Sequence, residues 1–447
     1  MANFSDFESS LALSRFGLGR RSGDAGGNAY IRMLQEIDDE VVEMPGGGKL
    51  PSTPDLFTEV WAWQNQVTAA KSANIPNPPS ATRFYDEIDA RFNGTMLTAE
   101  TGLGERLAMF WANHFALSRD KSDPVAAASG AFEREAIRPF LFGRFFDMLL
   151  AVETHPAMIY FLDNAYSVGP RSQMGGGGNG LNENLAREIL ELHTLGVRTG
   201  YSQADVTAFA HVLTGWTVVR PPSVPAGRTG SFAFSPAMHE PGVQTLMGRT
   251  YDDEGFMQGA HVLRDLASHP ATARHIATKL ASHFVSDVPP ASLVSRLETT
   301  FLDSEGDLKA VTRTLLQSDE AMDPRLQKLR LPQEYLAAMQ RATGQTLAPQ
   351  LVDGQLMRLG QPLWMPGGPN GFSDRLGVWA TPTSLQARID ISNSLSRTIA
   401  NPPDPRVLAD ATLGPLISDA SRNAVALAET RPQGLALTFL SPEFMRR

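Results

Sequence analysis

The chain has 447 residues, a net charge of −9 and no cysteine. The mild acidity argues against non-specific binding of nucleic acid, which needs clustered Lys and Arg, and the lack of cysteine excludes disulfides, thiolate metal sites and thiolate nucleophiles. No apolar run reaches the roughly 18 residues that suggest a membrane span, so we expect neither a nucleic-acid nor a membrane partner.

The N-terminal segment has no basic leader before an apolar run, because Arg20 and Arg21 follow the apolar residues. This order does not fit a secretory signal and favours a cytoplasmic protein. A periplasmic or exported location stays open if a leader has been removed or if a partner carries one.

Apolar residues recur at spacings of three and four along most of the chain. This pattern predicts helices over 104–117, 140–152, 184–195, 203–216, 256–268 and 271–285. We therefore expect an all-α fold, a multi-helix bundle or an irregular helical array. Prolines and short alternating pieces such as SFAF predict an irregular insertion with a small β-hairpin around 220–251. The chain would then divide into an N-terminal helical half (1–219), an irregular segment (220–255) and a C-terminal helical half (256–447).

The first candidate site is FWANHF at 110–115. His114 falls on the apolar side of the predicted helix, where an imidazole must find a partner or lose its charge. It is either a hydrogen-bonded core residue or a metal ligand or base. Asn113 points away from this side and is a candidate substrate-binding residue.

The next candidate, YFLDNAYS at 160–167, precedes a glycine-rich stretch (167–180) that predicts a mobile loop. Asp163 and Asn164 would cap or turn the chain, or would supply oxygen ligands.

The predicted helix over 184–195 has an unusually polar face. At about 100° per residue, Asn184, Arg187, Glu188 and Glu191 fall within one arc. Two carboxylates one turn apart can hold a divalent metal or divide into a proton donor and a proton acceptor. The alternative is a solvated face with an Arg187–Glu191 pair. His193 projects nearly opposite both glutamates, which predicts a hydrogen-bonded core histidine.

Two later loops also carry candidates. His239 and Glu240 lie together in the irregular segment, and loops often carry functional residues. The stretch GQPLWMPGGPNGFSD (360–374) exposes Trp364 among glycines and prolines.

No G-x-S-x-G, G-x-x-x-x-G-K-[ST] or H-E-x-x-H motif occurs, so the corresponding hydrolase, nucleotide and zinc-protease classes lack support.

Several stretches of the chain together resemble successive blocks of the bacterial family called domain of unknown function 1800. These stretches are WANHFALS, LNENLAREILELHTLGVRTGYSQADVTAFAHVLTGWT, HPATARHIATKLASHFV and LGQPLWMPGGPNGFSD. The resemblance runs from about Leu11 to the C-terminus and implies a helical fold, but it supplies no reaction. It also implies a protein partner from domain of unknown function 1501, whose exported members resemble sulfatases. One departure is His239–Glu240, where the family pattern is His–Asp.

Our leading hypothesis is a carboxylate- or metal-dependent hydrolase acting on a carbohydrate, because paired carboxylates and exposed aromatic rings suit sugars. The expected catalytic residues are Glu188, Glu191, Arg187 and His114. The expected substrate-binding residues are Asn184, Asn113, Asp163, Asn164 and Trp364. A divalent metal cofactor would use Glu188, His114 and His239. The alternatives are a non-catalytic binding partner of the sulfatase-like protein and a redox metalloenzyme with an iron or copper site.

Overall fold

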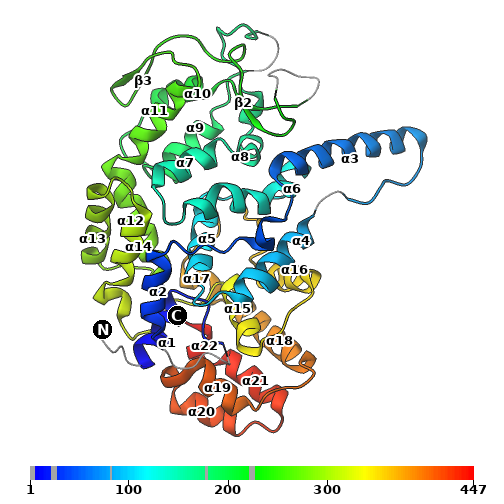
Figure 1. The fold of residues 1–447 in the computed structure, drawn as a ribbon, viewed down its shortest axis with the longest axis vertical. Helices are drawn as coiled ribbons and strands as arrows, with labels where there is room; N and C mark the ends of the chain where they lie inside the picture. Colours follow the sequence, from blue (N-terminus) through cyan, green and yellow to red (C-terminus); the bar gives the residue numbers. More distant parts are fainter. Residues whose placement is uncertain (1–5, 22–27, 81–82, 177–179, 221–226) are drawn as a thin grey trace.

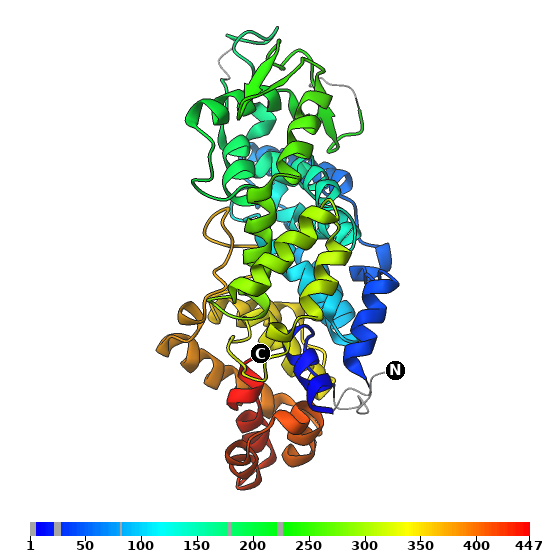
Figure 2. The same cartoon turned by 90° about the vertical axis from the view of Figure 1, so that its left-hand side faces the viewer.

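The computed structural model describes residues 6–21, 28–80, 83–176, 180–220 and 227–447. It is mostly helical with two small antiparallel sheets, which confirms the predicted fold class. The molecule is elongated, with the strands at one end and the C-terminal helices at the other (Figures 1 and 2). Within the described ranges, no helix combines the length and apolar character that crossing a membrane requires.

The helices before the strands are α1 (Asp6–Arg15), α2 (Ala29–Asp38), α3 (Thr53–Ala73), α4 (Phe84–Asp89), α5 (Leu103–His114), α6 (Asp123–Phe132), α7 (Phe145–Glu153), α8 (Pro156–Phe161), α9 (Asn184–Glu188) and α10 (Gln203–Leu213). Those after the strands are α11 (Phe256–Ala267), α12 (Pro270–Phe284), α13 (Ala291–Asp303), α14 (Leu308–Leu316), α15 (Pro332–Thr343), α16 (Pro349–Arg358), α17 (Leu376–Trp379), α18 (Pro382–Thr398), α19 (Pro405–Leu413), α20 (Asp419–Ala426), α21 (Arg431–Leu440) and α22 (Pro442–Met445). Short 3₁₀ turns are η1 (Pro45–Gly48), η4 (Arg138–Phe140), η5 (Asn164–Tyr166), η7 (Asp319–Met322) and η8 (Gly414–Leu416).

Local chemistry explains several helix boundaries. Ser202 and Asp205 form a reciprocal capping box at the start of α10. The prediction that this helix reaches Trp216 is wrong, because Gly215 takes a left-handed φ of 82° and Trp216 enters a strand. The helix predicted from Phe140 begins only at Phe145, since a 3₁₀ turn and Gly143 intervene.

The expected hairpin insertion is present as two short antiparallel pairs. Strand β1 (Trp216–Val218) pairs with β2 (Phe232–Phe234), and β3 (Gln244–Leu246) pairs with β4 (Arg249–Tyr251). The SFAF piece supplies β2. Residues 221–226 of the predicted insertion lie outside the described residues.

The apolar interior forms two main clusters. The larger one draws side chains from α1 through η7, on both sides of the strand insertion. The smaller one joins α4 and η2 to α15, α16 and the helices from α18 to α22. Helix α5 contributes to both clusters, through Trp111 to the first and Met109 to the second. It therefore lies at the junction of the two cores.

Three π turns interrupt the helices: η2 (Ala90–Met96), η3 (Glu133–Ile137) and η6 (Ile189–His193). Such turns are rare in proteins, and those that occur often lie at functional sites. The first two carry a buried charge network in which Glu133 pairs with Arg91 at 2.6 Å and with Arg138 at 2.8 Å. Arg138 also binds Glu105 at 2.6 Å. The network connects α5, η2 and η3 through charges that solvent does not screen.

Candidate functional site

The polar helix of the sequence is an α-helix only in its first half. Helix α9 ends at Glu188, and the π turn η6 continues to His193. A π turn closes its hydrogen bonds over five residues, so residues five apart come onto one face. Glu188 and His193 are five apart, so the helical wheel that placed them nearly opposite assumed an angle per residue that does not apply through η6. The prediction of a buried, hydrogen-bonded His193 is confirmed.

Arg187 neutralises most of the exposed part of this face. Its guanidinium lies 3.1 Å from Glu183 and 3.4 Å from Glu191. Glu183 also accepts hydrogen bonds from Thr207 and Gln203, and these contacts, with Arg187, lower its pKa. The Arg187–Glu191 pair is the helix contact that the sequence left open as an alternative to a site.

Glu188 differs from its two acidic neighbours. It is partly buried, and it forms no hydrogen bond or ion pair with any residue that the structure describes. Burial raises its pKa, and Glu191 and Glu153 add to this effect, while His193 and Arg187 oppose it. The face thus holds one carboxyl whose environment favours the protonated form, next to Glu183, whose environment favours the ionised form.

Beneath Glu188 lies a buried cluster of imidazoles. His193 Nδ1 lies 2.7 Å from a carboxylate oxygen of Glu153, and neither residue is exposed. His114 Nε2 donates to the main-chain carbonyl of His193 at 3.1 Å, and His275 Nε2 donates to that of Leu192 at 3.1 Å. Helices α5 and α12 therefore both contact η6 through a histidine.

Three polar atoms of this cluster have no partner: His114 Nδ1, His193 Nε2 and Glu153 Oε2. Burial, with Lys279 next in effect, lowers the pKa of His114 well below its usual value, and the same two causes lower the pKa of His275 to about 4. Both rings are neutral near neutral pH. The unpaired Nδ1 of His114 is therefore an acceptor enclosed in the protein, a costly state that is often associated with function.

Helix α12 carries a basic stripe along the side that faces this cluster. His275, Lys279 and His283 follow one another at intervals of four residues and so share one face. His283 Nδ1 lies 2.7 Å from Asp374, which ends the 360–374 loop. Burial alone would raise the pKa of Asp374, but His283 and Lys328 outweigh it and lower the pKa to about 2.

Asn113 attaches the 360–374 loop to α5. Its Nδ2 donates to the carbonyl of Phe372 at 2.9 Å, and its Oδ1 accepts from the N–H of Phe372 at 2.7 Å. Gly371 has a φ of 70°, and a Cβ there would lie 2.4 Å from the Asn113 carbonyl oxygen. Asn113 thus acts as a clamp on the loop backbone, and its amide is already occupied.

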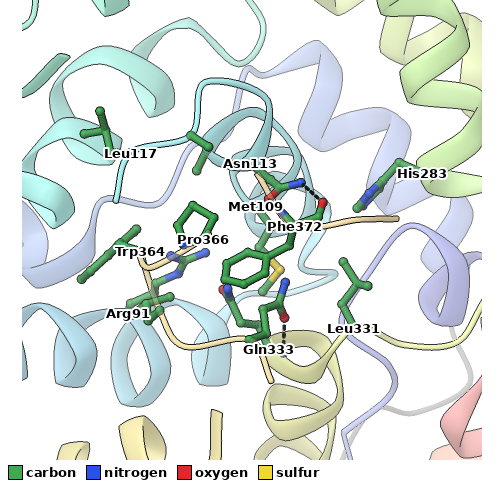
Figure 3. A pocket seen from close by; sticks show the side chains of 14 residues that line it. Arg91, Met109, Asn113, Leu117, His283, Leu331, Gln333, Trp364, Pro366 and Phe372 are labelled. Atoms are coloured by element: carbon green, nitrogen blue, oxygen red, sulfur yellow. Dashed lines mark hydrogen bonds between the residues drawn. The ribbon is translucent and has the colours of Figure 1, made fainter. Parts of the chain in front are cut away.

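A small cavity of about 40 Å³ lies under this loop, lined by side chains of α5, α12 and α15. Met109, Gln333 and the ring of Phe372 crowd its centre, while His283 and Trp364 stand on opposite sides (Figure 3). Trp364 has a left-handed φ of 50°, and its Nε1 lies 3.5 Å from Glu133. Trp364 therefore connects the loop to the buried charge network.

The remaining predicted residues lie in the strand-bearing part. Asn164 is buried and donates to the carbonyls of Leu213 and Trp216, so it holds the end of α10. Asp163 has a left-handed φ of 59° and pairs with Lys121.

His239 binds the carbonyl of Thr214, and Glu240 binds Arg171 from the glycine-rich stretch. Residues 177–179 of that predicted mobile loop lie outside the described residues. The side chain of Asn184 is exposed.

The expected metal set of Glu188, His114 and His239 is not assembled. Across the described ranges, no group of three or more His, Asp or Glu side chains is arranged to hold a metal ion.

The sequence interpretation also missed Glu153, His275, Lys279, His283 and Asp374. The four-residue spacing of polar residues in HPATARHIATKLASHF is the signal that could have found His275, Lys279 and His283. We call the assembly of α5, η6, α12 and the 360–374 loop the junction.

The fold and the junction define a mostly helical protein with buried imidazoles and carboxylates beneath a polar helix. The chain belongs to the family described as protein of unknown function (DUF1800), whose model matches residues 11–446. This match confirms the resemblance found in the sequence. No curated protein and no solved structure matches the chain.

Proposed function

We propose that the protein is a carboxylate-dependent hydrolase that acts on a carbohydrate, with Glu188 as its general acid. The observation that carries the proposal is the isolation of Glu188. It is the acidic side chain of the polar face that has no partner, and its pKa is raised by burial. A general acid must hold its proton near the working pH, and burial is the usual means of keeping it there.

Glu191 is the proposed partner, acting as base or nucleophile. Its carboxylate lies 3.4 Å from the Arg187 guanidinium on the same helix face. In hydrolysis, Glu188 would give its proton to the leaving oxygen while Glu191 supports attack at the sugar carbon. Arg187 would hold Glu191 in place and attract negative charge that develops on the substrate.

The test is the release of reducing sugar from a panel of polysaccharides and oligosaccharides by the full chain. Glu188→Gln should lower the rate by about 10²–10⁴-fold, the usual contribution of a general acid. Glu305→Gln, which changes an exposed carboxylate on a surface turn, should leave the rate unchanged. Full activity in Glu188→Gln would overturn the assignment.

The pH profile gives a second readout. Because Glu188 acts in its protonated form, the rate should fall as pH rises through its elevated pKa. A rate that stays level across this range would exclude Glu188 as the acid even where Glu188→Gln is slow.

A binding role is the second candidate, and one feature favours it. Helix α3 projects from the body of the molecule, and residues 71–75 at its tip are exposed (Figure 1). A partner chain, such as a sulfatase-like protein, would then copurify at a fixed ratio. Shortening the tip of α3 should abolish that copurification and leave any hydrolysis intact.

A further inference from the structure

A second cavity, of about 240 Å³, lies among the C-terminal helices. Helices α15, α16, α18 and α21 surround it, in the yellow-to-red part of the chain (Figure 1). Met339, Leu395 and Phe439 give it a buried apolar wall, and the half-buried Leu347 and Ile399 extend that wall. Within the described ranges it shares no lining residue with the cavity under the 360–374 loop, so the two spaces are separate.

The volume of this cavity sets the size of a ligand. A protein cavity of about 150 Å³ holds a benzene molecule, so a cavity of 240 Å³ has room for about nine or ten non-hydrogen atoms. A largely apolar wall favours an aliphatic body, because the transfer of apolar surface out of water drives binding.

The amide of Gln340 is the buried polar group of this wall, with an exposed fraction of 2%. Its Nε2 donates to Asn93 Oδ1 at 2.9 Å and to the carbonyl of Gln345 at 3.4 Å. The main-chain N–H of Leu347 also donates to Asn93 Oδ1, at 3.0 Å. Asn93 therefore presents its oxygen to Gln340, which fixes the amide of Gln340 with Nε2 towards Asn93. Both donors of that amide are already used.

What the wall offers to a ligand is therefore an acceptor. Gln340 Oε1 is buried and accepts no hydrogen bond from any residue that the structure describes. The hydroxyls of Thr343 and Thr398 donate to main-chain carbonyls of their own helices, both at 2.8 Å, and keep only lone pairs free. No charged side chain of the described residues lines the cavity, so nothing there would balance the charge of a carboxylate.

We propose that this cavity binds a neutral, medium-chain aliphatic alcohol, whose hydroxyl donates to Gln340 Oε1 and whose chain packs against the apolar wall. One donor on an apolar body matches one unused buried acceptor in an apolar cavity. A sugar would leave most of its hydroxyls unpaired against this wall, so the cavity is distinct from the proposed hydrolytic site. The inference does not depend on Glu188.

Isothermal titration calorimetry on the full chain tests the proposal with 1-octanol as the probe. Heptyl methyl ether has the same number of non-hydrogen atoms but no donor, and it should bind about fivefold more weakly, which is the usual contribution of one neutral hydrogen bond. Octanoate, which is charged and lacks a donor, should bind at least about tenfold more weakly than the alcohol. Equal affinities for the alcohol and the ether would overturn the proposal.

Two variants locate the bound alcohol. Ala348 is an exposed residue of the wall, so Ala348→Phe should fill part of the cavity and weaken the binding of 1-octanol about tenfold. Ala424→Phe, at an exposed position of α20 outside the cavity, is the matched control and should leave binding unchanged. Undiminished binding in Ala348→Phe would place the alcohol elsewhere and overturn the proposal.

The role of Gln340 has its own readout. In Gln340→Met, which keeps the length of the side chain and removes the acceptor, 1-octanol and the ether should bind equally. The ratio of the two affinities is measured, so a loss of stability alone does not produce this result. A preserved preference for the alcohol would overturn the assignment of Gln340. If this variant does not fold, the comparison of ligands on the wild type and the Ala348→Phe variant still decide the proposal.

Discussion

The clamp formed by Asn113 is a single residue whose removal should open one side of the junction. It makes two hydrogen bonds to the backbone of Phe372, at 2.9 and 2.7 Å, much as a neighbouring strand would. Asn113→Ala removes both bonds and leaves the main chain of α5 in place. We expect the 360–374 loop to detach locally while the protein stays folded.

The magnitude follows from the number of bonds. A hydrogen bond in a folded protein contributes about 1 kcal/mol net, so the two together contribute about 2 kcal/mol. Phe372 is partly exposed, and water can satisfy its freed backbone groups, so we add no penalty for a buried unpaired group. At 1.4 kcal/mol for each factor of ten, the opening equilibrium should increase about 30-fold.

Amide hydrogen exchange at Phe372 measures this opening directly. Its exchange should accelerate about 30-fold in Asn113→Ala. Asn113→Asp keeps an acceptor for the Phe372 N–H but loses the donor, so Phe372 should stay better protected than in the alanine variant. Asn370→Ala, an exposed position of the same loop, is the matched control and should change nothing. Unchanged exchange at Phe372 in Asn113→Ala would refute the clamp.

Three further predictions concern the buried charges. Glu334 binds Arg106 at 3.1 Å and Arg447 at 2.7 Å, so Glu334→Gln should lower the free energy of unfolding in urea by about 3–5 kcal/mol. Burial opposes ionisation of Glu334 and Asp374, but their cationic partners lower both pKa values to about 2. This stabilisation is complete above the unfolded values of 4.5 and 3.8, so urea midpoints should fall as pH drops towards 2. Burial and the nearby Glu105 raise the pKa of Glu43 to about 7, so its ionisation costs stability as pH rises from 4.5 through 7. The free energy of unfolding of Glu43→Gln, measured in urea, should therefore exceed that of the wild type by about 1–2 kcal/mol at about pH 8. The two should be equal at about pH 4.

Helix positions were predictable where one local period decided them. Helices α5, α11 and α12 appear within a few residues of their predicted ranges, because each has a single apolar stripe and a clear start or stop. The end of α10 was not predictable from that period. Trp216 continues the helical spacing, but Gly215 takes a left-handed φ and Trp216 pairs with Phe234, eighteen positions later.

The candidate site was predictable in part for a related reason. Neighbouring polar residues such as Arg187, Glu188 and Glu191 stand out in a local pattern, and the structure places them on one partly exposed face. Glu153 does not stand out, since its partner His193 lies forty residues away. The buried pair of Arg106 with Glu334 could not be predicted for the same reason, because the two residues are far apart in the sequence.

The π turns limit what a helical wheel can predict for the polar residues around η3 and η6. A wheel assumes one angle per residue, and a π turn changes that angle for every residue that follows. In η6 the turn ends at His193, which binds Glu153, and in η3 it accompanies the contact of Glu133 with Arg138, five residues apart. Poorer backbone geometry persists only where other contacts compensate for it, and here those contacts are buried ion pairs and hydrogen bonds to carboxylates. Local irregularity and buried charge therefore occur together in this fold, and a wheel drawn through either turn uses the wrong angle for the polar residues that follow.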